Sequence, residues 1–322
     1  MTNLMTPSTT SEVDRSPLTP FGLGVGAQLD TAIDSTAPTP SALASLRSLG
    51  VVRYRVNVSW RSVAPAAEII DHRVLDQLAD TIELVLDAGL EPLVALDNGA
   101  VPRHLEADGG WRNQATAAAY GDFVGAVGAR LGDMVEEWIT LADPQPARFD
   151  ASVLTVLARA QVISTNILRA HVPHARLGAS VDITQLTPGP TGRAWVHHLA
   201  SASARTSFVA LNIDQLGTRA PAEVADAVRE LDGLLPGRSF LLTETHVPVG
   251  SERLPNRLID IEYPDRYDVV AGFFDEIRRL RADQINVNGT FAWPFTGSSA
   301  AVEGIGESSI EAYHRISMAG IN

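Results

Sequence analysis

The feature that most constrains the fold is an alternation of short apolar segments with amphipathic segments, repeated along most of the chain. The apolar segments are rich in Val, Leu, Ile and Phe, as buried parallel strands are. We expect strands at 21–27, 51–58, 92–96, 135–141, 177–183, 208–213, 239–243 and 285–295. Apolar residues recur at helical spacing between them. We expect helices at 40–49, 72–88, 114–131, 152–170, 193–203, 221–234, 268–281 and 309–318.

Strands that alternate with helices pair in parallel through right-handed crossovers. Eight such units predict an α/β protein with a single (β/α)8 (TIM) barrel, and an open doubly wound sheet is the alternative. The open sheet commonly binds a dinucleotide, but the glycines of 22–26 follow the spacing G-x-G-x-G and no helix begins directly after them. The regular eightfold count therefore favours the barrel.

Composition narrows the classes of function. The chain of 322 residues has a net charge of −13, which argues against binding to nucleic acid or to an anionic membrane. It has no cysteine and no lysine, so thiolate nucleophiles, cysteine–zinc sites and Schiff-base lysines are excluded. No apolar stretch reaches the length of about 18 residues that a membrane span needs. A small-molecule substrate is the expected partner, with no cofactor and no metal, and nothing indicates the oligomeric state.

The chain divides at residue 20. Residues 1–20 are rich in Ser, Thr and Pro and lack the apolar core of a signal peptide. We expect 1–20 to be a disordered leader, 21–322 to be the barrel, and the protein to be cytoplasmic.

Two expected strands end in a lone carboxylate. The apolar run 138–142 is followed by Asp143 and Pro144, and the apolar run 240–243 is followed by Glu244. The carboxyl ends of barrel strands meet at one face, so these carboxylates could form an acid/base pair in one pocket. The alternative is that each carboxylate caps a helix or pairs with an arginine.

Other polar residues follow the expected strands and would form a ring around the same face. They are Gln28, Asn57, Ser59, Asp97, Asn98, Asp182, Asn212, Asp214, His246 and Trp293. Polar groups that converge at one barrel face are typical of an active site. His246 could shuttle protons if it points inward, or it is an ordinary loop histidine. Trp60, Leu216 and Phe295 are expected to wall the pocket, whereas His197 and His198 are expected on the surface of a helix.

Several motifs, in chain order, resemble glycoside hydrolase family 1, the retaining β-glycosidases. Residues 54–60 resemble the family's Y-R-F-S-I-S-W, residues 101–113 resemble P-x-W-L-E-x-x-G-G-W-x-N, and residues 138–144 resemble W-I-T-x-N-E-P. Residues 208–212 resemble F-x-G-x-N, residues 242–245 resemble I-T-E-N, and residues 289–293 resemble G-Y-x-x-W. Each match is loose, but the ordered set is specific and covers most of the chain.

The resemblance implies roles for five residues. Glu244 falls on the family's nucleophile, and Asp143 falls on its acid/base, where the family has glutamate. Arg55 falls on the arginine that contacts the nucleophile and would keep it ionised. Asn212 falls on a pocket asparagine, and Trp293 falls on the tryptophan beneath the sugar.

The departures from the family are as informative as the matches. Ala142 replaces the asparagine that holds the sugar 2-hydroxyl, Asn98 replaces a histidine, and Asp214 replaces the tyrosine that contacts the nucleophile. Asp143 is one methylene shorter than glutamate, and Asp214 is an alternative base. Most sugar-binding positions have thus changed while two carboxylates remain.

Three functions stay open from the sequence. The first is an enzyme that acts on an acetal or glycosidic C–O bond by carboxylate acid/base catalysis. The second is a non-hydrolytic natural-product tailoring enzyme on the same scaffold, such as a cyclase, a dehydratase or a spiroketal-forming enzyme. The third is a catalytically degenerate binding barrel.

Overall fold

The computed structural model describes residues 20–29, 38–97, 101–142, 151–186, 190–201, 206–213, 220–245 and 266–292. For residues 23, 25–29, 97, 184–185, 190–192, 244–245, 266–270 and 292 it describes the backbone and not the side chain. The expected helix at 309–318 and the expected leader up to residue 19 lie outside the described residues.

Eight parallel strands close into a barrel in which every strand pairs with its sequence neighbours and β1 also pairs with β8, which confirms the predicted (β/α)8 fold. The strands are β1 (Gly22–Leu29), β2 (Val51–Ser59), β3 (Glu91–Asp97), β4 (Glu137–Ala142), β5 (Arg176–Asp182), β6 (Phe208–Asn212), β7 (Ser239–Thr245) and β8 (Val287–Ala292). All of them run the same way, so their carboxyl ends meet at one face.

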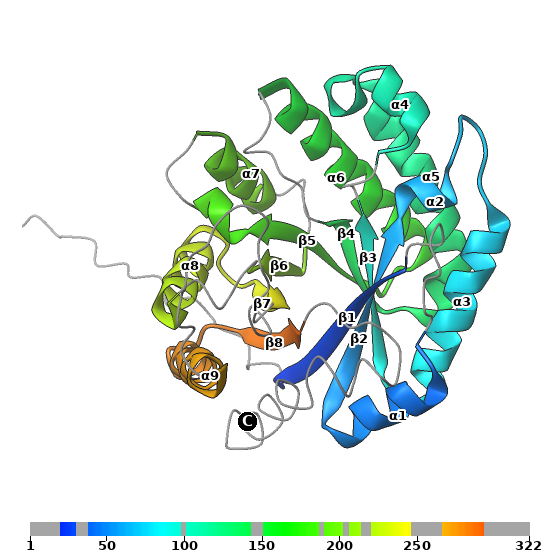
Figure 1. The fold of residues 1–322 in the computed structure, drawn as a ribbon. Helices are drawn as coiled ribbons and strands as arrows, with labels where there is room; N and C mark the ends of the chain where they lie inside the picture. Colours follow the sequence, from blue (N-terminus) through cyan, green and yellow to red (C-terminus); the bar gives the residue numbers. More distant parts are fainter. Residues whose placement is uncertain are drawn as a thin grey trace, which may run out of the picture.

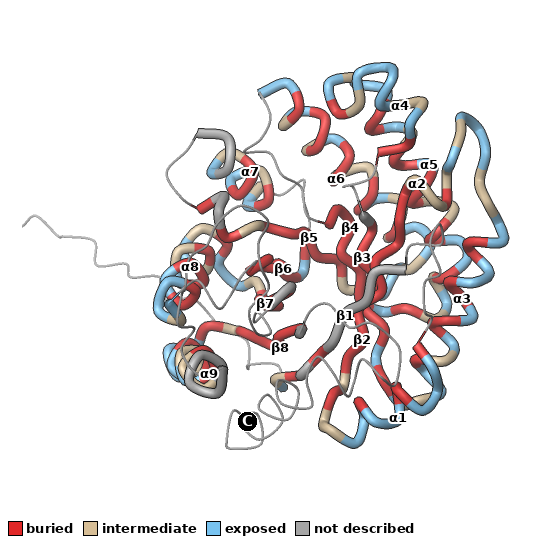
Figure 2. Tube along the Cα trace, viewed as in Figure 1, coloured by how far each residue is buried: buried red, intermediate tan, exposed pale blue. Residues whose placement is uncertain are grey.

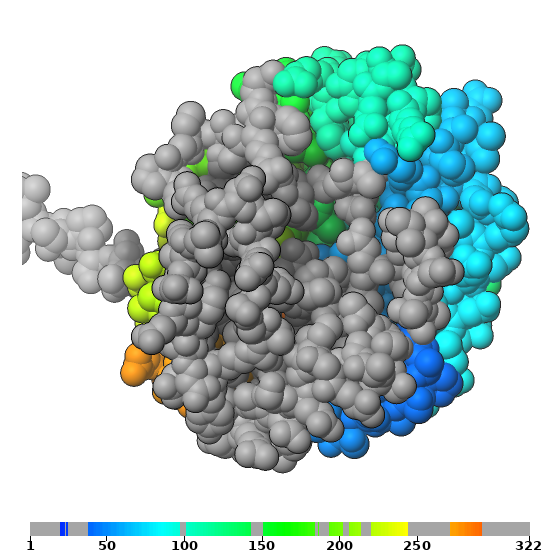
Figure 3. Space-filling model, viewed as in Figure 1, coloured from blue at the N-terminus to red at the C-terminus, as the bar shows by residue number. Residues whose placement is uncertain are grey.

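Helices surround the barrel (Figure 1). They are α1 (Pro40–Ser48), α2 (Trp60–Val63), α3 (His72–Asp87), α4 (Arg103–Ala107), α5 (Ala115–Leu131), α6 (Ala151–His171), α7 (Pro190–Ala200), α8 (Pro221–Leu234) and α9 (Arg266–Ala282). The residues from α1 to α5 form one continuous outer surface in the space-filling view (Figure 3). Figure 2 shows the burial that results, with buried strands inside and helices exposed on their outer sides.

Local signals explain where several helices begin and end. The Thr39 hydroxyl accepts from the Ala42 N–H at 3.2 Å, and Pro40 occupies the first helical position of α1. The Asp71 carboxylate caps α3 in the same way. The loop after α3 turns through Gly89, whose φ of 74° favours glycine. These signals mark the start of α1 and both ends of α3, the helices that come before β2 and β3 in the chain.

The expectation that no stretch is long and apolar enough to span a membrane was wrong, because the helix α6 is long and apolar enough, by length and composition alone, to cross one. In this fold it packs along α5 and against β4, and its buried residues include Val156, Leu157, Ala160 and Leu168. This packing explains the apolar character of α6, which is a helix of the barrel wall.

The inside of the barrel has polar residues at both ends and an apolar middle. The middle is a buried cluster of Leu93, Ala95, Ile139, Ala142, Phe208, Ala210, Leu241 and Phe291. Two glycines make room for its aromatic rings: a Cβ at Gly178 would lie 2.3 Å from the Phe208 ring, and one at Gly24 would lie 2.5 Å from the Phe291 ring. This apolar plug separates the carboxyl ends of the strands from their amino ends.

Candidate functional site

The carboxyl end of β2 contributes a buried arginine and its acceptor. Arg55 is 2% exposed, and Asn57 lies two residues further along the strand and therefore on the same side. The Arg55 Nε donates to Asn57 Oδ1 at 2.9 Å. This bond directs the guanidinium toward the carboxyl end of the barrel, where a negatively charged group would be stabilised by it.

The carboxyl ends of β6 and β7 lie side by side. Asn212, which is 3% exposed, pairs in register with Thr243. The Thr243 hydroxyl donates to the Leu211 carbonyl at 3.3 Å and also lies 3.5 Å from Asn212 Oδ1. Glu244 follows Thr243 directly, so its backbone lies beside the pocket asparagine that the sequence predicted.

Two strands carry an extra residue at this end of the barrel. Along β3 and β4, Ala95 pairs with Ile139 but Asp97 pairs with Ala142. Along β7 and β8, Leu242 pairs with Thr290 but Thr245 pairs with Ala292. Such bulges redirect side chains and are frequent next to active sites. The bulge in β4 lies just before Asp143, and the bulge in β7 contains the backbone of Glu244.

Further predicted residues are placed by their backbone. Gln28 pairs in register with Asn57, and Asp97 pairs with Ser59, so both lie at the same end of the barrel. The side chains of Gln28, Asp97 and Glu244 are outside the described residues. Asp143, Asp214, Asn98, His246 and Trp293 lie wholly outside them, and their roles stay predictions.

The structure places Trp60 in the core between the barrel and α5. Its indole is 1% exposed and packs against Trp111, Tyr120 and Phe123, with ring centroids 5.0 to 6.0 Å away. Contact with a substrate, as predicted from the sequence, would require this indole to leave the aromatic cluster. Trp60 thus supports the barrel wall, because α2 turns its side chain toward α5.

Sequence reasoning missed three buried polar residues next to the end of β4. They are Tyr120 of α5, Thr140 of β4 and Gln161 of α6, none of which has any measurable exposure. Tyr120 lies within the expected helix 114–131 and gave no sign of a polar role. Only a register shift between strands reveals why hydroxyl and amide groups are needed there.

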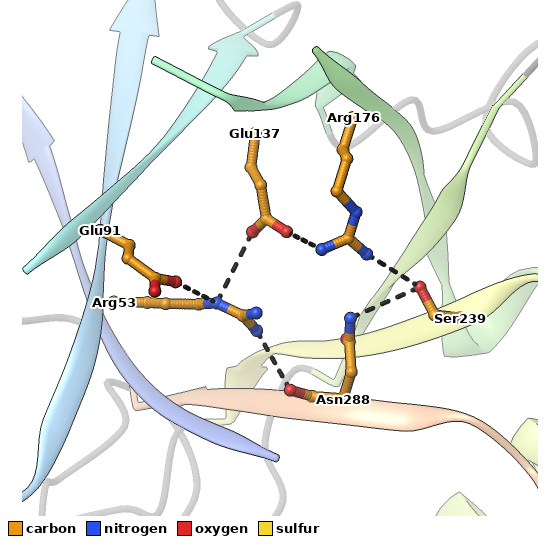
Figure 4. Close-up of polar contacts among 6 residues, drawn as sticks. All are labelled: Arg53, Glu91, Glu137, Arg176, Ser239 and Asn288. Carbon is orange, nitrogen blue, oxygen red and sulfur yellow. Dashed lines mark hydrogen bonds and ion pairs between the residues drawn. The ribbon is translucent and has the colours of Figure 1, made fainter. Parts of the chain in front are cut away.

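A second polar cluster lies at the amino ends of the strands (Figure 4). Glu137 forms ion pairs with Arg176 and, at 3.6 Å, with Arg53. Arg53 Nη1 donates to the Asn288 carbonyl at 3.1 Å, and Arg176 Nη2 donates to the Ser239 hydroxyl at 3.4 Å. Active sites of such barrels lie at the opposite face, so we expect this cluster to stabilise the fold.

Within the part of the chain that the structure describes, no group of three or more His, Asp or Glu side chains could hold a metal ion. The arrangement at the carboxyl ends instead offers a buried cation, amide groups and hydroxyls around two bulged strands. Such a site can stabilise charge that develops on a bound molecule.

Comparisons with known proteins agree with this architecture. The model of glycosyl hydrolase family 1 matches residues 11–182, just over half of the chain. Lactase/phlorizin hydrolase of Rattus norvegicus is 30% identical over 128 residues, which cover 39% of this chain and 7% of that protein. Beta-glucosidase A of Acetivibrio thermocellus is 24% identical over 178 residues, which cover 53% of this chain and 40% of that protein. The chain thus matches less than half the length of these relatives.

Solved structures extend the likeness in fold to most of the chain. A family 1 β-glucosidase from Thermotoga maritima superimposes with a TM-score of 0.66 at 16% sequence identity. The match covers 87% of this chain and 89% of that one.

Proposed function

This chain belongs to glycosyl hydrolase family 1, and from that premise we propose that it acts on an acetal or glycosidic C–O bond through the carboxylates of Asp143 and Glu244. Its pocket is altered away from simple sugars. The observation that carries the proposal is the pair of bulges in β4 and β7, of which the first directly precedes Asp143 and the second contains the backbone of Glu244.

The proposed chemistry uses the two carboxylates in different roles. Asp143 gives its proton to the leaving oxygen as the C–O bond breaks, and Glu244 stabilises the positive charge that develops on carbon, either as an ion or by forming a bond to it. Water then supplies a hydroxyl group to that carbon, any bond between the carbon and Glu244 breaks to release the carboxylate, and the remaining proton of the water goes to Asp143. Asp214 is the alternative base.

Described residues that neighbour the two positions in the strands support this division. Arg55 and Asn57 offer positive charge and an amide beneath the mouth of the barrel, which suits an ionised Glu244. Ala142, which precedes Asp143, is 2% exposed and belongs to the apolar cluster with Ala95 and Ile139. Apolar surroundings favour the protonated form of a carboxyl group and suit a general acid.

We predict weak or absent turnover of aryl β-glucosides. Ala142, Asn98 and Asp214 each replace a group that, in the family, binds a sugar hydroxyl or the nucleophile. A polar group left without its partner in a buried site costs roughly 1–3 kcal/mol. Three such changes would remove most of the transition-state binding of a glucoside, while a less polar cyclic ether or ketal would lose little.

The experiment compares 4-nitrophenyl β-glucoside with less hydroxylated 4-nitrophenyl glycosides and with ketal substrates, using wild type, Glu244→Gln and Asp143→Asn. Each substitution should lower turnover of the best substrate roughly 10²- to 10⁴-fold. Efficient cleavage of the glucoside by wild type would overturn the altered pocket. Unchanged activity in both variants would overturn the carboxylate mechanism itself.

A second candidate is a non-hydrolytic tailoring enzyme, such as a cyclase or a spiroketal-forming enzyme. The apolar environment of Ala142 favours it, since a substrate there meets a methyl group where the family has an amide. Both reactions pass through states that resemble an oxocarbenium ion. A product that gains no water, identified by its mass, would distinguish this candidate from hydrolysis. No turnover of any substrate would favour the binding barrel.

A further inference from the structure

The end of β4 is held by side chains where regular strand pairing stops. Toward β3, the pairing passes from Ile139 to Ala142 with one residue too many on β4. Toward β5, the paired residues run from Glu137 to Ile139. Thr140 and Leu141 therefore lie between the regular ladder and Asp143, in a stretch whose backbone groups need other partners.

Tyr120 provides a partner on the β3 side. Its hydroxyl lies 3.0 Å from the Leu96 carbonyl and 3.3 Å from the Thr140 carbonyl, so one hydroxyl bridges the two strands at the bulge. The ring packs against Trp60, Trp111 and Phe123, with centroids 5.0 to 5.6 Å away. A rigid ring with a hydroxyl at its tip sets the separation of the two strand ends.

Gln161 provides a partner on the β5 side, through Thr140. The Gln161 Nε2 donates to the Thr140 hydroxyl at 2.7 Å, and that hydroxyl donates to the Gly178 carbonyl at 2.9 Å. Thr165, one turn after Gln161 on α6, lies 3.3 Å from the same amide nitrogen. All of these side chains are fully buried, so no water substitutes for them easily.

We propose that Tyr120 and Gln161 are positioning residues that set the place and direction of the Asp143 carboxyl by fixing the bulged end of β4. This inference rests on the proposed function, in which Asp143 is the general acid. A misplacement of a catalytic group by about 1 Å can lower a rate about 100-fold. Neither residue touches the reacting atoms in this proposal, since both act through the backbone and the hydroxyl of Thr140.

The variants are chosen to remove single polar groups. Tyr120→Phe keeps the ring and loses the hydroxyl. Thr140→Val loses the link to Gln161 and Gly178, whereas Thr140→Ser keeps it. Phe123→Leu is the matched control, because it loosens the same aromatic cluster without touching any polar contact of β4.

The first measurement is hydrogen exchange of the backbone amides, followed by mass spectrometry. Tyr120→Phe and Thr140→Val should speed exchange in the peptide that contains residues 139–145 and leave the peptides of β6 and β7 unchanged. Thr140→Ser and Phe123→Leu should exchange as wild type does in that peptide. Unchanged exchange at 139–145 in both Tyr120→Phe and Thr140→Val would overturn the inference, whether or not the protein proves to be a glycosidase.

The second measurement compares leaving groups on the glycoside that wild type accepts best. Loss of acid catalysis slows a substrate with a poor leaving group, such as methylphenol, and spares one with a good leaving group, such as dinitrophenol. Tyr120→Phe should slow the methylphenyl substrate about tenfold or more and the dinitrophenyl substrate by less than about twofold. A loss of stability alone would slow both equally, as expected for Phe123→Leu. Equal slowing of both substrates in Tyr120→Phe would overturn the positioning role.

Asp143→Asn separates this inference from the proposed function. If Asp143→Asn slows neither substrate selectively, the assignment of the acid is wrong, even where hydrogen exchange shows that Tyr120 holds β4. If Asp143→Asn is selective and Tyr120→Phe is not, the acid is assigned correctly and the positioning role is wrong.

Discussion

Two threonines occupy equivalent places in the two bulged strands. The Thr140 hydroxyl donates to the Gly178 carbonyl of β5, and the Thr243 hydroxyl donates to the Leu211 carbonyl of β6. Thr140 precedes Asp143 by three residues, and Thr243 precedes Glu244 by one. A short side chain that replaces a ladder hydrogen bond lets the strand add a residue without leaving a buried carbonyl unpaired. The threonines of both motifs therefore have a structural reason that does not depend on substrate.

Another single residue, His198 on α7, differs from its expected surface position. It is half-buried, and its ring stacks on Trp195 with centroids 5.5 Å apart. Its Nε2 is buried without a hydrogen-bond partner among the described residues. Burial lowers the pKa of His198 below its ordinary value of 6.5.

The lowered pKa predicts how stability changes with pH. As the pH falls through 6.5, the unfolded chain binds a proton at His198 that the folded chain does not, so the free energy of unfolding falls. The change ends once the pH is below the pKa of the folded state. We expect His198→Gln to flatten the dependence of the melting temperature on pH between about 7 and 5. His197→Gln, which alters the exposed neighbour, is the control, and an equal slope in wild type and His198→Gln would contradict the prediction.

At the level of elements, α5 and α6 approach closely because α5 presents glycines to its neighbour. A Cβ at Gly121 would lie 2.7 Å from Ile163 Cγ2, whereas a Cβ at Gly125 would lie 3.8 Å from Ile167 Cγ2. The first distance is a clash and the second is an ordinary contact. The same approach brings Tyr120 and Gln161 to either side of β4.

This packing predicts opposite effects for two alanine substitutions in one helix. Gly125→Ala should raise the free energy of unfolding by up to about 1 kcal/mol, because alanine favours the helix and has room. Gly121→Ala should lower it by roughly 1–3 kcal/mol through overpacking. Urea unfolding followed by circular dichroism measures both. Equal effects of the two substitutions would show that the helices move apart freely, and hydrogen exchange in β4 would then rise in both.

The sequence predicted the elements better than their ends. Every described strand overlaps its expected range, because apolar runs and turn residues mark buried strands well. The strand β7 was expected to end at Thr243 but continues to Thr245, so Glu244 lies inside it. The helix α7 begins at Pro190 and not at Arg193, because proline suits a first helical turn. Short helices such as α4 have too few residues to show a period.

The candidate site was predictable only in part, for a physical reason. Arg55 was identified through its match to the family's arginine and Asn212 through its place at the end of an apolar strand, and the structure buries both. The bulges in β4 and β7 depend on pairing between strands, which no local pattern records. Tyr120 and Gln161 form hydrogen bonds with Thr140 at the bulged end of β4, so their roles become visible only once the strand pairing is known.

On the scale of the whole molecule, the barrel interior has two polar ends with different tasks. The carboxyl ends carry the proposed chemistry, and the amino ends carry the cluster around Glu137. The apolar plug between them, which includes Ile139, Leu241 and Phe291, separates the two ends by a closely packed layer and closes the barrel to water. A change at the amino ends should therefore alter stability without altering the reaction of the folded protein.

Two carboxylates that contact the same arginine allow a direct test. Glu137, whose side chain is 11% exposed, pairs with Arg53 and Arg176. Glu91, whose side chain is 71% exposed, pairs with Arg53 at 3.4 Å. Glu137→Gln leaves two partly buried arginines without their shared counter-charge and should lower the free energy of unfolding by roughly 3–5 kcal/mol. Glu91→Gln should lower it by less than about 1 kcal/mol, because water screens an exposed pair.

Urea unfolding of both variants measures their free energies of unfolding, and turnover is measured per folded molecule. Because the Glu137 cluster joins β2, β4, β5, β7 and β8, its loss should weaken the closure of the whole barrel rather than one element. Hydrogen exchange should then rise at the amino ends of all these strands together. Equal stability of Glu137→Gln and Glu91→Gln would show that the apolar plug alone closes the barrel, and reduced turnover per folded Glu137→Gln molecule would show that the two ends are coupled.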